Sequence, residues 1–117
     1  MDWRREEKDL FKRALDEFEG GYFYACHDTL EELWREEIDP YIKDFLWAFI
    51  QLSIARYHEE NQNEVGARQM REKARKKALR ARDGKEMLLF FEKYFNAAEM
   101  LEALIKEEVY EFRRQTN

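Results

Sequence analysis

The chain has 117 residues, carries 21 Lys and Arg against 26 Asp and Glu, and contains a single cysteine. A chain of this length is typical of one domain, and a lone cysteine excludes an internal disulfide. Four glycines and one proline leave little room for a hairpin-rich β fold, whereas 44% hydrophobic residues can fill one core. We therefore expect a single all-α domain over residues 1–117.

The N-terminal ten residues, MDWRREEKDL, are charged where a secretory signal would be apolar. The longest apolar run, residues 45–55, is too short to cross a bilayer. These features and the unpaired cysteine predict a cytoplasmic protein with no membrane partner. The 40% content of charged residues is typical of a thermophile and indicates no activity.

Three helices are expected in the first half. Residues 3–21 carry apolar residues at helical spacing from Leu10 to Phe18 and end at Gly20 and Gly21, which suit a helix terminus. Residues 22–37 carry the next helical stripe. Asp39 and Pro40 then predict the N-terminus of a third helix that runs to about His58. Because this helix is apolar nearly all round, we expect it to be the central one.

The second half predicts two or three further helices. Residues 60–63, ENQN, interrupt the pattern, and a fourth helix follows from Glu64 to Arg82, with a thin apolar stripe that begins at Val65. A short helix is expected within residues 87–95. Asn96 with Glu99 has the capping-box pattern of a last helix, whose core face includes Val109 and Phe112. The expected architecture is a compact bundle of five to six helices, with a C-terminal helix pair over residues 86–115.

A basic run occupies residues 68–85, where nine Lys and Arg accompany only Glu72 and Asp83. Such a helix could bind phosphates, but it lacks the interleaved aromatic residues that stack on nucleotide bases. A solvated face that pairs with acidic neighbours is the simpler interpretation. Nucleic acid is therefore not the expected partner.

Polar residues interrupt the apolar stripes of the second and third helices. His27, Glu31 and Trp34 share one helical face, because they lie at positions i, i+4 and i+7. Gln51 and His58 share a face of the next helix with Trp47 and Ile54. We expect antiparallel helices to bring His27, Glu31, Gln51 and His58 together.

Three interpretations of this cluster remain open. His27, Glu31 and His58 could hold a divalent metal such as zinc or iron(II), as in a metal-dependent hydrolase. Glu31 could instead polarise a histidine for acid–base chemistry or help to bind a small ligand. The group could also be a buried hydrogen-bonded network that fixes helix register. Cys26 points about 100° away from His27 on a helix and is not expected to be a ligand.

The residues also resemble a known family. Residues 21–34 (GYFYACHDTLEELW), 49–58 (FIQLSIARYH) and 63–67 (NEVGA) are similar to three motifs of domain of unknown function 309, DUF309. The resemblance covers about residues 8–82. It implies a small helical protein without an established activity, and its motif positions are His27, Glu31, Trp34, Gln51, His58, Asn63 and Gly66. The residue after the histidine is often Glu in that family and is Asp28 here, which weakens the case for a second carboxylate in a metal site.

Two further expectations concern packing and assembly. Gly66 lies inside a predicted helix, where glycine is retained if a ring such as Trp34 or Tyr57 comes close, or where the helix start tolerates it. If the domain has no chemistry, Trp3 and Tyr110 are the expected exposed aromatic residues for assembly, including a homo-oligomer.

Overall fold

The computed structural model describes residues 3–115, and within them the chain forms six α-helices and no strand beyond one isolated bridge between Phe95 and Arg114. The helices are α1 (Arg5–Glu19), α2 (Phe23–Glu36), α3 (Pro40–Glu60), α4 (Glu64–Ala81), α5 (Lys85–Phe91) and α6 (Ala97–Lys106). The predicted all-α fold is confirmed. None of these helices is long and apolar enough to cross a membrane.

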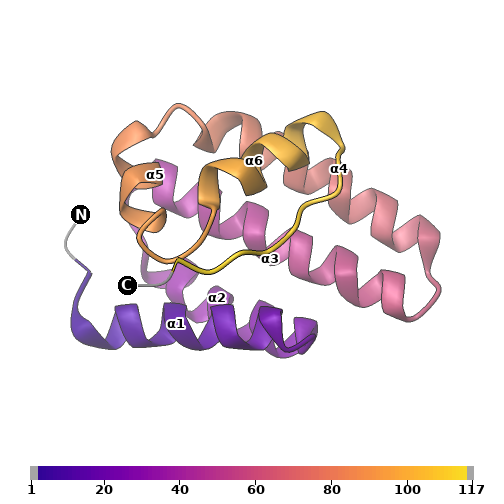
Figure 1. The fold of residues 1–117 in the computed structure, drawn as a ribbon, viewed down its shortest axis with the longest axis horizontal. Helices are drawn as coiled ribbons and strands as arrows, with labels where there is room; N and C mark the ends of the chain where they lie inside the picture. The colour runs from indigo at the N-terminus through magenta and orange to yellow at the C-terminus, as the bar shows by residue number, and fades with distance from the viewer. Residues whose placement is uncertain (1–2, 116–117) are drawn as a thin grey trace.

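The central position of α3 is also confirmed. Figure 1 shows α3 running between the α1–α2 pair on one side and α4, α5 and α6 on the other. Its N-terminus forms as expected, because the Asp39 side chain accepts hydrogen bonds from the backbone N–H groups of Tyr41 and Ile42. Burial of large apolar side chains is the main driving force for such packing. The largest fully buried ones are Phe11, Phe45, Phe49, Phe91 and Phe95.

The C-terminal segment departs from the prediction. The last helix ends at Lys106, where Glu107 adopts a left-handed conformation with φ of 58°. Residues 107–115 then run extended across α3 toward α1 (Figure 1). Val109 is 92% exposed, while Phe112 packs on Phe95 with ring centroids 5.7 Å apart. The predicted helical core face through Val109 and Phe112 is therefore wrong, because the chain there is extended and alternates between buried and exposed side chains.

Asn96 explains how this extended segment is held. Its side-chain Oδ1 accepts from the Tyr110 hydroxyl at 2.7 Å and from the Arg113 N–H at 3.0 Å, while its Nδ2 donates to the Glu111 carbonyl at 2.9 Å. Asn96 does precede α6, but its side chain makes no capping hydrogen bond to that helix. The expected capping box is not formed, because the side chain binds the C-terminal segment and the Glu99 carboxylate instead.

Two other expectations about exposure and packing are wrong. Trp3 and Tyr110 are 7% and 8% exposed, so neither offers a free aromatic surface for assembly. Val65, expected on the apolar stripe of the fourth helix, is 57% exposed. The close contacts of α4 with the rest of the bundle are made by the small residues Ala67, Ala74, Ala78 and Ala81, which let the helix approach α3 closely.

Candidate functional site

The residues predicted from the stripes of the second and third helices lie on the side of α3 that faces away from the phenylalanine core. By helical spacing, Trp47, Gln51, Ile54 and His58 share this side. It is flanked by α2, through a Trp34–Trp47 ring contact at 4.9 Å, and by α4, through Lys77 over Trp47. We call this surface, which also includes Tyr24, His27, Glu31 and Tyr57, the outer face of α3.

His27 lies at the edge of the outer face, half-buried. Its Nδ1 is 3.0 Å from Asp28 Oδ1 and its Nε2 is 3.3 Å from Glu31 Oε2. Glu31 is held in turn by the Arg35 guanidinium. A neutral imidazole donates through only one nitrogen, so it can serve only one of these two carboxylates at a time. The predicted contact between His27 and Glu31 is thus present.

His58 does not touch His27 or Glu31. It is connected to them by two tyrosine rings: His27 contacts Tyr24 at 5.2 Å, Tyr24 contacts Tyr57 at 5.2 Å, and Tyr57 contacts His58 at 5.8 Å between ring centroids. Tyr24 and Tyr57 are partly exposed. We call these four side chains the ring ladder. Sequence reasoning missed both tyrosines, although Tyr24 lies one turn before His27 and Tyr57 directly precedes His58.

The predicted metal site is not formed by these side chains. Asp28 and Glu31 bind opposite edges of one imidazole and do not converge on a point, as ligands of a metal ion must. His58 is separated from them by the rings of Tyr24 and Tyr57. In the described part of the chain, no group of three His, Cys, Asp or Glu side chains is arranged to hold a metal ion.

Asn63 and Gly66 lie next to His58, at one end of the ring ladder. Asn63 Oδ1 accepts from the Gly66 N–H at 3.0 Å and caps α4, while its Nδ2 lies 3.4 Å from His58 Nδ1. A Cβ at Gly66 would lie 2.6 Å from Asn63 Nδ2 and 3.0 Å from His58 Cδ2. The close approach expected at Gly66 is therefore present, and the nearest atoms belong to Asn63 and His58.

Two polar atoms of the outer face are buried without a hydrogen-bond partner. They are the Trp34 Nε1, a donor, and the Gln51 Oε1, an acceptor. Gln51 is only 7% exposed. A buried polar group without a partner costs about 1–3 kcal/mol, so such groups are rare in folded proteins.

Two lysines cover the tryptophan pair. Lys43 Nζ lies 4.7 Å from the Trp34 ring centroid, and Lys77 Nζ lies 4.3 Å from that of Trp47. The pKa of Lys77 is lowered, first by burial and then by the nearby cation Arg80, with Lys76 and Lys73 adding to the effect and Asp44 opposing it. The tryptophan pair therefore lies in a region of excess positive charge.

Cys26 lies beneath the outer face and is inert as packed. It is fully buried, and its sulfur lies 3.4 Å from the Ser53 hydroxyl oxygen. Burial raises the pKa of the thiol to about 12.

Three arginines of the basic helix form hydrogen bonds or ion pairs within the fold. Arg80 forms two hydrogen bonds with Asp44, Arg71 pairs with Glu59 at 2.8 Å, and Arg75 donates to the Ile105 carbonyl. These contacts agree with a face that pairs with its surroundings. That nucleic acid is not a partner, and that the chain forms a homo-oligomer, both stay predictions.

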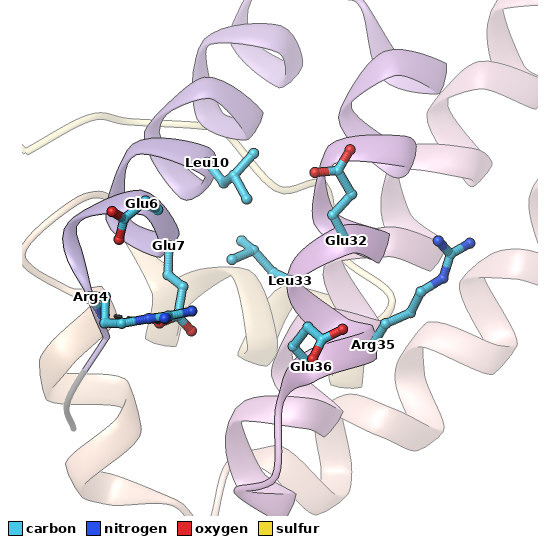
Figure 2. A pocket seen from close by; sticks show the side chains of 8 residues that line it. All are labelled: Arg4, Glu6, Glu7, Leu10, Glu32, Leu33, Arg35 and Glu36. Atoms are coloured by element: carbon cyan, nitrogen blue, oxygen red, sulfur yellow. Dashed lines mark hydrogen bonds and ion pairs between the residues drawn. The ribbon is translucent and has the colours of Figure 1, made fainter.

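A small hollow of about 360 Å³ lies between α1 and α2. Figure 2 shows Leu10 and Leu33 between the two helices, while Glu6 and Arg35 point away from the hollow. Glu7 is paired with Arg4 at 3.3 Å. This hollow shares none of its lining residues with the outer face.

Comparison with known proteins gives the family. The model of a domain of unknown function, DUF309, matches residues 11–70. Over 48 residues, or 41% of this chain, the sequence is 40% identical to the uncharacterized protein YpuF of Bacillus subtilis (strain 168), of which the aligned segment spans 28%. No solved structure matches. The chain belongs to the DUF309 family, as the motifs around His27, His58 and Gly66 indicated.

Proposed function

We propose that this DUF309 protein binds a small anionic molecule on the outer face of α3, against the Trp34–Trp47 pair. The observation that carries the proposal is the pair of buried polar atoms without partners, Trp34 Nε1 and Gln51 Oε1. A ligand with a carboxylate or carbonyl oxygen satisfies the indole N–H, and a donor group on the same molecule satisfies the amide oxygen.

The charge of the ligand follows from the lysines. Lys43 and Lys77 are held by cation–π contacts, which at partly exposed sites contribute about 0.5–1 kcal/mol each. Moving the ammonium groups off the rings to meet an anion therefore costs little. An anion also stabilises the charged form of Lys77, whose pKa is lowered first by burial and then by the nearby Arg80 cation.

The competing interpretation is a structural network, and it makes the opposite prediction for Gln51. If the amide oxygen is unsatisfied in the free protein, Gln51→Leu should raise the free energy of unfolding by about 1 kcal/mol, because it removes a buried polar group and adds apolar contact. Ser53→Ala is the matched control, since Ser53 is buried but donates to the Phe49 carbonyl at 3.0 Å. It should be neutral or destabilising. Destabilisation by Gln51→Leu, measured by urea unfolding, would favour the network.

Binding is tested with 3-aminobenzoate, which offers a carboxylate and a donor on one ring. Titration should shift the indole N–H resonances of Trp34 and Trp47 in NMR spectra. Trp3 is an internal reference, because its Nε1–H already donates to Glu37 at 2.9 Å. Aniline, which lacks the carboxylate, should bind at least about five-fold more weakly, given a contribution of about 1 kcal/mol from the ion pair.

Gln51→Leu and Lys77→Met should each weaken 3-aminobenzoate binding. Equal shifts at all three indoles, or no saturable shift up to millimolar probe, would reject the anion site. A saturable shift that survives both substitutions would place the ligand elsewhere.

A further inference from the structure

A second hollow lies on another side of α3 and shares no residue with the outer face. Its volume is about 760 Å³, against about 360 Å³ for the hollow between α1 and α2, and it is bounded by α3, α4, α6 and the extended C-terminal segment. In Figure 1 the chain leaves α6 beside α4 and then crosses in front of α3. Residues 107–110 of this crossing segment line the hollow. The volume lies within the range of about 300–1,000 Å³ that is typical of small-molecule sites.

The floor of this hollow is apolar. Leu52 of α3, Ala103 and Leu104 of α6 and Tyr110 of the C-terminal segment line it, and each is less than a tenth exposed. The Tyr110 hydroxyl is engaged with Asn96, so the ring is fixed as part of the wall. A ligand body that contacts this floor must therefore be apolar.

The rim carries charges of both signs, and the α3 side is internally paired. Glu59 binds Arg56 at 3.2 Å and Arg71 at 2.8 Å, which leaves neither guanidinium without a carboxylate. Arg56 also lies over the Phe23 ring, with its Cζ 5.0 Å from the ring centroid. These groups are held in place by contacts within the protein.

The remaining rim charges are mainly negative. Glu72, Glu107 and Glu108 line the hollow, and their carboxylates take part in no ion pair or side-chain hydrogen bond among the described residues. Arg68 is the one rim cation in residues 3–115 without such a partner. Over the whole rim, four carboxylates face three guanidinium groups, so an occupant meets an apolar floor and an excess of one carboxylate.

We propose that this hollow binds a small molecule with an apolar body and a protonated amine. The apolar part packs on Leu52, Leu104 and Tyr110, and the ammonium group lies among the carboxylates of the rim. The charge is opposite to that of the ligand proposed for the outer face, so the two sites can be tested independently.

The test uses phenethylamine as the probe, followed by backbone NMR of the full chain. Saturable shifts are expected at Leu52, Leu104 and Tyr110, with smaller affinity at higher salt because exposed charges are screened. 3-Phenylpropionate, which has a carboxylate in place of the amine, should not shift these resonances. The absence of saturable shifts with phenethylamine, or equal binding of 3-phenylpropionate, would overturn the proposal.

Variants locate the site. Glu72→Gln with Glu108→Gln should weaken phenethylamine binding by roughly ten-fold, since each exposed ion pair contributes up to about five-fold. Glu32→Gln with Glu36→Gln is the control, because it removes the same charge from the hollow between α1 and α2. Ala103→Leu, which fills the floor, should abolish binding in a variant whose spectrum stays folded. An equal loss in both carboxylate pairs, or binding unaffected by Ala103→Leu, would contradict the assignment.

Discussion

The two polar surfaces on α3 are built differently. The outer face uses His, Trp, Tyr and Gln, and two of its polar atoms are buried without partners. The hollow beside α6 uses Leu, Ala, Glu and Arg, and its polar groups are paired or exposed at the rim. The first surface comes from α2, α3 and α4, which follow one another in the chain, whereas the second needs α6 and the extended segment after it. A surface made from consecutive helices can be predicted from the sequence, because its polar residues interrupt the apolar stripes. A surface that is completed by a distant segment shows no such pattern in the sequence.

Among the substitutions that distinguish the two surfaces, Asn96→Ala should have the largest effect on stability. The substitution removes three hydrogen bonds that hold the C-terminal segment and leaves buried groups without partners, so we expect a loss of about 3 kcal/mol in the free energy of unfolding. Urea unfolding measures it. Asn61→Ala is the control, because Asn61 is exposed and its side chain donates only to the Tyr57 carbonyl at 2.8 Å.

The same variant separates the two surfaces. In folded Asn96→Ala, phenethylamine binding should be lost, since Tyr110 no longer closes the hollow, while 3-aminobenzoate should still shift the Trp34 indole. Loss of both binding events would show that the outer face also depends on the C-terminal segment.

A second prediction concerns the buried layer beneath the outer face. The pKa of Cys26 is raised by burial from 9.0 to about 12, so the thiol form is favoured in the folded chain. Its contribution to stability is complete below pH 9.0 and is lost as the pH rises toward about 12, because the unfolded chain releases the proton first. Between pH 9 and 10.5, the free energy of unfolding should fall more steeply in the wild type than in Cys26→Ala.

Thiol labelling gives an independent check on the same residue. Native protein should react with iodoacetamide at pH 8 only at the rate at which it unfolds. Rapid labelling under native conditions would mean that the layer between α2 and α3 opens, and that the outer face is not rigid.

The smallest effect is expected at the end of the ring ladder. Gly→Ala inside a helix usually stabilises by about 1 kcal/mol. At Gly66 the new Cβ would displace Asn63, which caps α4, so we expect almost no net gain in the wild type. In an Asn63→Ala background, Gly66→Ala should recover part of the gain of about 1 kcal/mol, because the contact with His58 Cδ2 at 3.0 Å remains. Additive effects of the two substitutions would show that Asn63 and Gly66 are not coupled through this contact.

Much of the fold could be predicted from local sequence. Asp39 and Pro40 set the start of α3, Gly20 and Gly21 end α1, and both features act through the backbone of a few neighbouring residues. The end of α6 could not be predicted in this way, because Glu107 takes a left-handed conformation without being a glycine. The alternation of aromatic and charged residues at Tyr110, Glu111, Phe112 and Arg113 was the available signal for an extended segment.

Part of the candidate site could likewise be predicted from local sequence, and part could not. The sequence by itself determined the family, the helices and the stripe of His27, Glu31, Gln51 and His58, because helical spacing is a local property. Only the tertiary structure decided that two tyrosines separate the histidines, that Lys77 reaches Trp47, and that Gln51 is buried without a partner. These facts depend on how far apart helices settle and which side chains fill the space between them, and packing over the whole core fixes both.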